Sequence, residues 1–359
     1  MSAKVLRVGI IGQGRSGRDI HGKELAKMSE QYMIRAIADS IVDRQELAKR
    51  EYGCNAYGTW QEMVENEELD LVVNASPSHL HYQITQELLE RGLNVLCEKP
   101  LAKSPEEVDR LIEQSKLSGK TLAVFQNSRY QPAFIQIRKI IESGILGRIV
   151  QIDFDYNGFA RRWDWQTLQS NNGGNLMNTG PHPVDQALQL FGTDIMPQIT
   201  CIMDRANTFG DAEDYVKLIL RAQGRPTIDL EISSCSVFSH EIFNIQGTLG
   251  GLHGSTEKLE WKYYIPEEAP KQQLIQEPLF KQDGTPAYCS EKLNWHTDQW
   301  ELSLPPDIEA FDYMTGKLYS MLYRTLVNGV PLEITAQQVR QQMAVMEECR
   351  RQNPHIYTV

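Results

Sequence analysis

The sequence predicts an α/β protein in which a doubly wound parallel sheet comes first and an α+β region with a large, mostly antiparallel open sheet follows. The first part of the chain alternates short apolar runs with longer amphipathic stretches, which is typical of parallel βαβ units. After about residue 145, strands with alternating apolar and polar residues replace this pattern. Because 359 residues exceed one typical domain, we expect a first domain at 1–125 and a second at 126–359, with room for the C-terminal helix to return to the first domain.

Short apolar runs in the first domain are the expected parallel strands. They lie at 5–12, 32–39, 69–76, 94–100 and 121–127. Helices are expected between them. At 104–119, Ser104 is an expected N-cap, Pro105 takes the first helical position, and acidic residues fill the first turn. These features are typical of a doubly wound sheet.

The second domain is expected to contain a β-hairpin and a closing pair of helices. Segments 214–222 and 227–238 flank the turn sequence QGRP, and segment 148–156 alternates in the same way. The closing helices are expected at 307–329 and 335–352.

Composition and charge restrict the classes of function. The formal net charge of -11 argues against a nucleic-acid surface, because phosphate binding requires clustered Lys and Arg. The six cysteines show neither paired spacing nor a CxxC motif, so we expect free thiols in a reducing cytoplasm and no structural zinc. A signal peptide and an apolar run of membrane-spanning length are both missing from the pattern. We therefore expect a cytoplasmic protein with a small-molecule substrate and no nucleic-acid or membrane partner.

A glycine loop follows the first strand. Gly12, Gly14 and Gly17 form GxGxxG where the strand gives way to a helix. In a dinucleotide-binding loop these glycines allow a tight turn, close approach of the backbone to a pyrophosphate, and close packing of helix on strand. Main-chain amides at the helix N-terminus would bind the anion. The cofactor-binding candidates here are Gly12, Gln13, Gly14, Arg15 and Ser16. A glycine turn without a ligand is the alternative.

Asp39 ends the second strand and is expected to bind the adenosine ribose of the cofactor. Its carboxylate can accept hydrogen bonds from both ribose hydroxyls and would repel a 2′-phosphate, which favours NAD over NADP. Ser40 and Arg44 are near enough in the sequence to weaken this preference. The alternative role for Asp39 is a helix N-cap.

The strand that ends in CEKP delivers Glu98 and Lys99 to the carboxyl edge of the sheet, where open α/β sheets bind their ligands. Both side chains are therefore expected to face the cofactor. The alternative is an exposed strand end with a solvated ion pair, the usual fate of adjacent charges.

With three further motifs, this strand end resembles the glucose-fructose oxidoreductase / inositol dehydrogenase / rhizopine-catabolism (Gfo/Idh/MocA) family. The other motifs are the glycine loop, NASPSHLH at 74–81 and GGNLMNTGPHPVDQALQLFG at 173–192. The resemblance covers nearly the whole chain. It implies a Rossmann domain followed by a mixed-sheet domain, NAD(P)-dependent hydride transfer on sugars or cyclitols, and assembly into a homodimer or homotetramer.

The resemblance also implies roles for single residues. Lys99 would reach the reacting hydroxyl, and the peptide bond before Pro100 would often be cis. The positions that match the nicotinamide side are Ser76, Pro77 and His79. For His79 and His81 the alternative is ordinary capping and surface placement.

The second-domain helix carries the remaining chemistry. Where the family has an acid, a histidine and a second acid, this chain has Asn178, His182 and Asp185. An amide cannot accept a proton at neutral pH, so Asn178 is expected to orient the substrate or the imidazole. His182 is the expected general base, because its unperturbed pKa lies near neutrality, and Asp185 would fix its tautomer. A structural role is the alternative for His182.

Substrate binding is expected from a loop and from the cleft between the domains. The loop sequence GFARRWDWQT at 158–167 combines arginines with two indoles, which can stack on a pyranose or a cyclitol. Alternatively, both indoles pack on the sheet. The substrate-binding candidates are Lys99, Asn127, Arg129, Tyr156, Arg162, Trp163, Trp165, Asn178, His182 and Asp185.

We therefore expect an NAD-dependent oxidoreductase that interconverts a secondary alcohol and a ketone on a sugar, a sugar derivative or an inositol. Lys99 would polarise the hydroxyl while His182 takes its proton, so no metal is expected. Two alternatives stay open. One is a redox-neutral NAD-dependent glycosidase, and the other is a ligand-sensing relative that keeps the fold and the dinucleotide without the chemistry.

Overall fold

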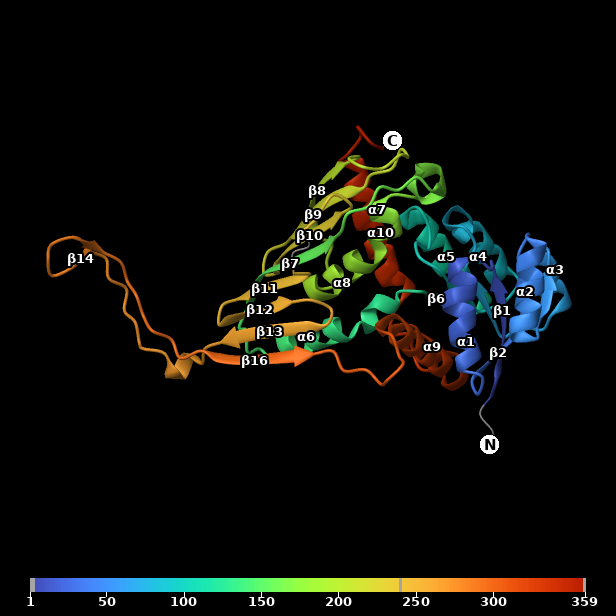
Figure 1. Ribbon diagram of the computed structural model, residues 1–359, viewed down its shortest axis with the longest axis horizontal. Coiled ribbons are helices and arrows are strands. Elements are labelled where there is room, and N and C mark those ends of the chain that lie inside the picture. Colours follow the sequence, from blue (N-terminus) through green and yellow to red (C-terminus); the bar gives the residue numbers. More distant parts are fainter. Residues whose placement is uncertain (1–3, 239–240, 358–359) are drawn as a thin grey trace.

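The computed structural model describes residues 4–238 and 241–357, and these residues form two large sheets, with helices between and around them, and one small two-stranded sheet (Figure 1). Within these residues the first sheet has six strands in the order β3-β2-β1-β4-β5-β6, and all neighbouring strands are parallel. This confirms the doubly wound parallel sheet. The strand order reverses between β1 and β4, and such a reversal is where ligands bind in this type of sheet.

The elements of this first region alternate as expected. Strands and helices, with η for 3₁₀ or π turns, are β1 Leu6–Ile11, η1 Arg15–Gly22, α1 Lys23–Lys27, β2 Tyr32–Ala38, α2 Val42–Tyr52, β3 Asn55–Tyr57, α3 Trp60–Asn66, β4 Leu71–Asn74, η2 Ser78–Leu80, α4 His81–Glu90, β5 Val95–Cys97, α5 Pro105–Ser118, β6 Leu122–Val124, η3 Asn127–Tyr130 and α6 Pro132–Glu142. At the start of α5 the Ser104 hydroxyl accepts the amide of Glu107, and Pro105 is the first helical residue, as predicted.

The second sheet is mixed and mostly antiparallel. In the described part of the chain it has eight strands in the order β16-β13-β12-β11-β7-β10-β9-β8. The pair β7 and β10 is parallel, and the other neighbours are antiparallel, including the expected hairpin of β9 and β10. Helices α6, α8 and α10 cover the face toward the first sheet (Figure 1).

The second region continues to the C-terminus. Its elements are β7 Ile149–Asn157, η4 Trp165–Thr167, η5 Gln169–Asn171, α7 Asn175–Asn178, α8 Pro181–Phe191, β8 Gln198–Asp204, β9 Tyr215–Arg221, β10 Thr227–Ser233, β11 Phe243–Gly247, β12 Gly250–Gly254, β13 Lys258–Tyr263, η6 Pro266–Glu268, β14 Leu279–Phe280, β15 Pro286–Ala287, β16 His296–Glu301, α9 Ala310–Asn328 and α10 Ala336–Arg351. The two expected closing helices are α9 and α10.

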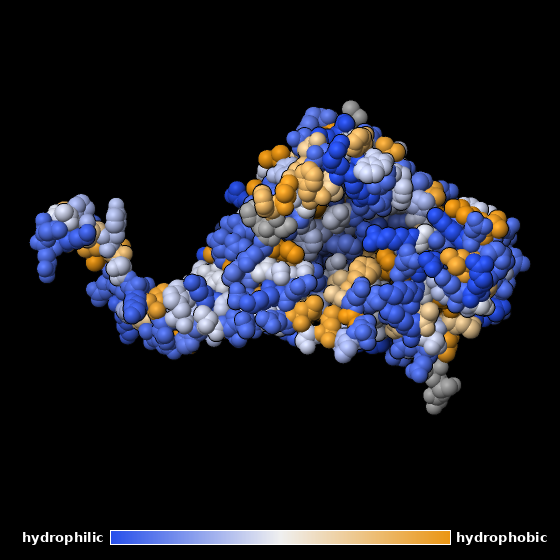
Figure 2. Space-filling model, in the orientation of Figure 1, coloured by the Kyte–Doolittle hydropathy of each residue, from blue (hydrophilic) through white to orange (hydrophobic). Residues whose placement is uncertain are grey.

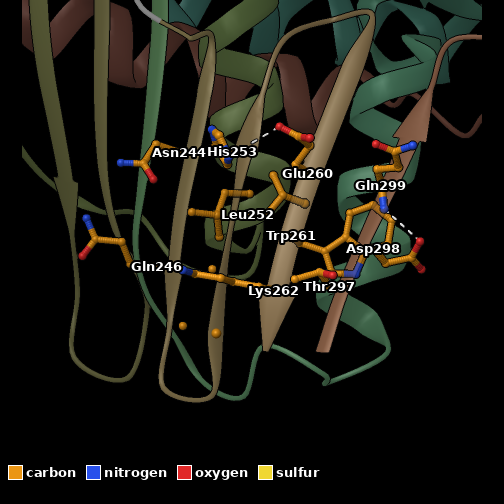
Figure 3. Close-up of a pocket in the computed structure, with 14 residues that line it drawn as sticks. Asn244, Gln246, Leu252, His253, Glu260, Trp261, Lys262, Thr297, Asp298 and Gln299 are labelled. Atoms are coloured by element: carbon orange, nitrogen blue, oxygen red, sulfur yellow. Dashed lines mark hydrogen bonds and ion pairs between the residues drawn. The ribbon is translucent and has the colours of Figure 1, made fainter. Parts of the chain in front are cut away.

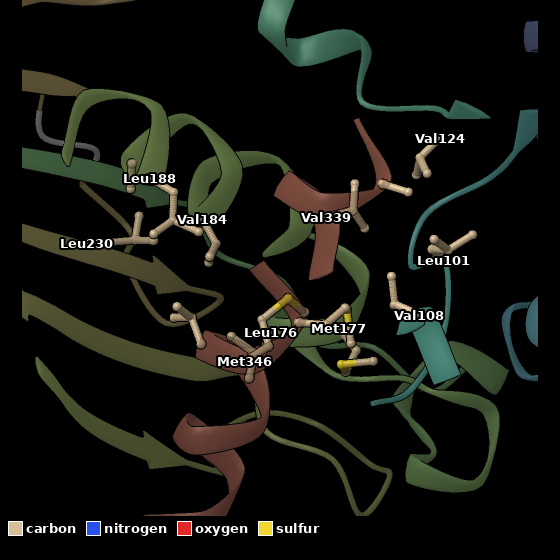
Figure 4. Close-up of a cluster of buried hydrophobic side chains, with 14 of the residues drawn as sticks. Leu101, Val108, Val124, Leu176, Met177, Val184, Leu188, Leu230, Val339 and Met346 are labelled. Carbon is tan, nitrogen blue, oxygen red and sulfur yellow. The ribbon is translucent and has the colours of Figure 1, made fainter. Parts of the chain in front are cut away.

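Helix α10 joins the cores of the two regions. Its Val339 and Met346 belong to one buried cluster with Val108 of α5, Val124 of β6 and Leu230 of β10 (Figure 4). Because apolar side chains from both regions lose contact with water in this cluster, their burial holds the two sheets together.

Helix α9 packs on the first sheet instead. Its Leu318 and Tyr319 are buried in a second cluster with Leu6 and Val8 of β1. The first of the two closing helices thus returns to the first region, where the Tyr319 hydroxyl reaches His21.

A long arm separates two neighbouring strands of the second sheet. Residues 264–295 leave at the end of β13 and return at the start of β16, although Tyr263 and His296 are directly paired. The arm projects away from the body (Figure 1), and its surface is largely hydrophilic with separate apolar side chains (Figure 2). Leu274 and Tyr288 are 88% and 93% exposed. The sequence pattern did not predict this excursion.

Candidate active site

The carboxyl ends of the parallel strands bring the predicted cofactor residues to one edge of the first sheet. Gly12 follows β1, Asp39 follows β2, and Ser76 stands two residues after β4. Glu98 follows β5, where its amide donates to the Asn74 carbonyl at 3.0 Å. Segments that are far apart in the sequence therefore meet at the point where the strand order reverses.

Two of the three glycines in the glycine loop have no room for a side chain, whereas the third has free space beside it. Gly12 has φ +86°, and a Cβ there would lie 2.5 Å from the Ala75 carbonyl oxygen. A Cβ on Gly17 would lie 1.8 Å from the Gly12 carbonyl oxygen. The nearest atom to a Cβ on Gly14 is Nη1 of Arg44, at 4.0 Å. The position that would approach a pyrophosphate is thus open, which fits a dinucleotide.

Asp39 is tied into this loop. Its Oδ2 accepts the main-chain amide of Gln13 at 2.7 Å and approaches Nη1 of Arg44 at 3.4 Å. Its Oδ1 accepts the amide of Ile41 at 2.9 Å. Ile41, not Asp39, occupies the N-cap of α2, so the helix-cap alternative is wrong. The carboxylate instead joins β2 to the glycine loop.

Lys99 lies at the end of β5 and reaches into the second region. Its Nζ donates to the main-chain carbonyl of Asn178 at 2.8 Å, and its peptide bond to Pro100 is cis, as the resemblance implied. Burial lowers the pKa of Lys99, although Glu98 opposes this. Because Lys99 contacts the main chain of residue 178, the Asn found there in place of Asp leaves this contact intact.

Glu98 is buried beneath Lys99 and is ionised. Its Oε2 accepts the amide of Lys99 at 3.0 Å, and its Oε1 lies 3.3 Å from Nε2 of His21. Burial alone would raise the pKa of Glu98, but His21 and the nearby Lys99 lower it to about 2. The alternative of an exposed strand end with a solvated ion pair is therefore wrong, because Glu98 is buried.

His21 was missed by the sequence analysis. It is fully buried at the end of η1, and its Nδ1 lies 2.8 Å from the Tyr319 hydroxyl of α9. The imidazole thus links Glu98 to a helix that is almost 300 residues away in the chain. A lone histidine in the charged stretch RSGRDIHG gave no indication of this role.

His182 is the second residue of α8 and lies close enough to Lys99 to feel its charge. Burial and, to a smaller extent, the Lys99 cation lower the pKa of His182 to about 3, although Glu98 opposes both. Its Nδ1 is buried and makes no hydrogen bond with the described residues. The near-neutral pKa expected from the sequence is therefore wrong, and the imidazole is neutral at pH 7.

Asp185 does not act on His182. Both of its carboxylate oxygens accept hydrogen bonds from Arg129, at 2.6 Å from Nε and 2.7 Å from Nη2. Arg129 Nη1 also donates to Gln338 at 2.7 Å. The expectation that Asp185 fixes the imidazole tautomer is wrong, because a bidentate guanidinium already occupies it.

The remaining substrate candidates fall into two groups. Asn127 and Tyr156 lie in the interior, where the Tyr156 hydroxyl donates to Gln186 at 2.6 Å and Oδ1 of Asn127 is buried without a hydrogen bond in the described chain. Trp163 and Trp165 are 76% and 47% exposed, so they do not pack on the sheet. Arg162 donates to Asp164 at 2.8 Å beside them.

The two histidines of NASPSHLH differ in exposure. His79 is exposed in η2, whereas His81 is buried, with Nδ1 2.7 Å from the Pro100 carbonyl and Nε2 2.9 Å from the Ser76 carbonyl. Surface placement of His81 is therefore wrong. This side chain holds the turn of Ser76 and Pro77 against the cis peptide bond of Lys99.

A hollow lies away from these residues, on the open face of the large sheet. It has a volume of about 740 Å³ and is lined by β11, β12, β13 and β16, with side chains such as His253, Glu260 and Gln299 (Figure 3). Neither Lys99 nor His182 lines it. Among the described residues, no group of three or more His, Cys, Asp or Glu could hold a metal ion, and no helix is long and apolar enough to span a membrane.

The parallel sheet, the open glycine loop and the acid at the end of β2 define an NAD(P)-binding oxidoreductase. Two sequence profiles of one family match the chain. The profile described as "Oxidoreductase family, NAD-binding Rossmann fold" matches residues 6–126, and the "GFO/IDH/MocA C-terminal domain" profile matches residues 134–253. The chain therefore belongs to the Gfo/Idh/MocA oxidoreductase family, as its motifs indicated.

The chain is also similar to individual oxidoreductases. The chain is 31% identical over 218 residues to scyllo-inositol 2-dehydrogenase (NADP(+)) IolW of Bacillus subtilis, which covers 60% of this chain and 59% of that protein. It is 28% identical over 202 residues to D-glucoside 3-dehydrogenase of Escherichia coli, covering 54% and 56%. The matches span less than two thirds of these two relatives. The solved structure of the oxidoreductase YvaA of Bacillus subtilis has the same fold, with a TM-score of 0.76, 24% identity, and coverage of 99% and 98%.

Proposed function

We propose that this oxidoreductase uses NAD to interconvert a secondary alcohol and a ketone on a sugar, a sugar derivative or an inositol. The observation that carries the proposal is a partly buried lysine, Lys99, close to the neutral imidazole of His182 at the cofactor edge of the sheet, where Nδ1 of His182 makes no hydrogen bond with the described residues. The relatives named as dehydrogenases of an inositol and of a glucoside support the substrate class.

In the oxidative direction, the Lys99 ammonium would donate a hydrogen bond to the substrate hydroxyl and stabilise the negative charge that develops on its oxygen. The neutral His182 would accept the hydroxyl proton. As an alkoxide forms beside Lys99, the positive field that depresses the pKa of His182 weakens, so proton transfer becomes easier. When bound, the nicotinamide supplies the acceptor for the carbinol hydride. Asn178 and the exposed indoles of Trp163 and Trp165 would orient the ring of the substrate.

The choice of NAD rests on Asp39. Its carboxylate stands at the end of β2 with little exposure, and a 2′-phosphate would meet its charge. Arg44 lies at 3.4 Å and partly balances that charge. The inositol dehydrogenase relative is named for NADP(+). The ratio of the dissociation constants for NADH and NADPH tests the preference of this chain for NAD.

The direct test is the absorbance of NADH when the protein and NAD meet inositols, aldoses, uronates and aryl glycosides. We expect a sustained rise with one substrate class, and a loss of about 10²-fold or more in Lys99→Met. The matched control is Lys103→Met, which removes a nearby exposed lysine that pairs with Glu107. Full turnover by Lys99→Met with cofactor bound would refute the proposal. Release of an aryl group without NADH would identify a glycosidase instead.

We also propose that the chain forms a homodimer or homotetramer. Support comes from the apolar side chains that the arm exposes, including Leu274 and Tyr288. Light scattering should give two or four times the mass of one chain, and a monomer at micromolar concentration would contradict this.

A further inference from the structure

A buried carboxylate that the proposed chemistry does not use, Glu213, lies against α7. It is 1% exposed and stands two residues before β9. Its Oε1 accepts the main-chain amide of Leu176 at 2.6 Å, and its own carbonyl accepts the amide of Asn175 at 3.0 Å. Glu213 therefore satisfies two of the amides that the start of a helix leaves without partners.

The other end of α7 holds the proposed catalytic lysine. Lys99 Nζ donates to the carbonyl of Asn178, the last residue of α7, at 2.8 Å. The amide of His182 then donates to the carbonyl of Thr179 at 3.3 Å. Because α7 is a single turn of four residues, a displacement of its first amides moves the carbonyl at its end.

Glu213 is itself held in place from the opposite side. Its Oε2 accepts a hydrogen bond from the hydroxyl of Tyr357, near the C-terminus. The neighbouring Ile356 carbonyl accepts Nε2 of Gln169 at 2.9 Å. At Gly174, just before α7, a Cβ would lie 2.6 Å from Glu213 Oε2, so this close approach requires glycine. The C-terminal segment and α7 thus enclose the carboxylate.

We propose that Glu213, held by Tyr357, is a positioning residue that fixes α7 so that the Asn178 carbonyl keeps the Lys99 ammonium in place for catalysis. The catalytic part of this inference rests on the proposed function. The geometric part, from Tyr357 through Glu213 and α7 to Lys99, does not.

Two consequences follow for a chain without the carboxylate. The amide of Leu176 loses its acceptor, whereas the amide of Asn175 keeps the main-chain carbonyl of residue 213, so the start of α7 is loosened and its amides should exchange with solvent faster. The Asn178 carbonyl should then leave Lys99, and because a hydrogen bond to the charged form favours that form, the pKa of Lys99 should fall. If turnover uses Lys99, kcat should fall by about 10²-fold, as expected for a misplacement of about 1 Å.

The experiment compares four variants with the full-length wild type. Glu213→Ala removes the acceptor, Glu213→Gln keeps one oxygen for Leu176, and Tyr357→Phe removes only the hydroxyl that holds the carboxylate. Glu67→Ala is the matched control, because Glu67 is also a carboxylate that accepts a tyrosine hydroxyl, from Tyr57 at 2.7 Å, but it lies in the first region away from α7.

Two measurements need no substrate. Hydrogen exchange followed by mass spectrometry reports the amides of 175–178, and competitive acylation of Lys99 at several pH values reports its pKa. Glu213→Ala should accelerate exchange at least about tenfold and lower the pKa of Lys99. Glu213→Gln should stay near wild type, Tyr357→Phe should lie between them, and Glu67→Ala should change neither quantity.

The proposal is overturned if Glu213→Ala leaves Lys99 unchanged, or if Glu67→Ala produces the same changes. If Glu213→Ala does not fold, wild-type behaviour of Tyr357→Phe in both measurements overturns it. Steady-state kinetics add the catalytic part: kcat should fall while KM for the dinucleotide changes by less than about twofold. A wild type without turnover, combined with the Lys99 shift, would refute the proposed function and leave the positioning role standing.

Discussion

The buried pair of Arg129 and Asp185 gives the sharpest prediction about stability. The two side chains are 8% and 3% exposed and meet through two hydrogen bonds of 2.6 and 2.7 Å. Removing one partner leaves the other charge buried without compensation, which typically costs about 3–5 kcal/mol. Asp185→Asn should therefore lower the free energy of unfolding by about 3 kcal/mol or more, measured by urea denaturation with tryptophan fluorescence.

The same variants decide between two roles for Asp185. In the double variant Arg129→Met with Asp185→Leu, the loss should be smaller than the sum of the single losses by about 2 kcal/mol, because neither charge is left alone. The kcat of folded Asp185→Asn should stay within a few-fold of wild type. Additive losses of stability, or a fall in kcat of about 10²-fold in a stable Asp185→Asn, would refute the ion-pair role and restore the tautomer role.

Three further predictions concern the cofactor edge and the buried acid. Gly14→Ala should fold normally but lose affinity for NADH, measured by fluorescence. Gly17→Ala should unfold at a lower temperature, because the added Cβ would lie 1.8 Å from the Gly12 carbonyl oxygen, whereas a Cβ on Gly14 meets no backbone atom within 4 Å. Equal effects of the two substitutions would contradict the loop geometry. Asp39→Asn should raise the affinity for NADPH relative to NADH by about tenfold, since it removes the charge that a 2′-phosphate would meet, and an unchanged ratio of dissociation constants would contradict this. Burial raises the pKa of Glu213 to about 7, so this carboxyl group binds a proton more tightly in the folded than in the unfolded chain. Its contribution to the free energy of unfolding should therefore be complete below about pH 4.5 and should decrease by about 3 kcal/mol as the pH rises to 7. Denaturation of Glu213→Gln at several pH values should lack this decrease, and the same decrease in that variant would contradict the assignment to Glu213.

Local patterns predicted most of the first region. The close contact of Gly17 with the Gly12 carbonyl lies within one βα unit, and the Ser104 cap depends on its own helix, so neither required a contact with a distant segment. The resemblance supplied Lys99 and His182. The family match confirms the class of protein from which these assignments came.

Contacts between distant segments could not be predicted in the same way. Arg129 and Asp185 are 56 positions apart, and His21 and Tyr319 are 298 apart, so no local period relates them. The pKa of His182 depends on burial by segments that meet only in the folded chain. The hydrogen-bond partners and the charges of the candidate site residues therefore depend on the folded chain and could not be predicted from local patterns.

The most direct test of the proposed chemistry follows the hydride itself. The substrate found in the absorbance screen would be labelled with deuterium at the carbinol carbon, and the NADH produced would be analysed by mass spectrometry. We expect one deuterium in NADH for each ketone formed, and no labelled NADH from Lys99→Met. Deuterium that exchanges into water, or that returns to the product without net NADH, would contradict an alcohol dehydrogenase at this site.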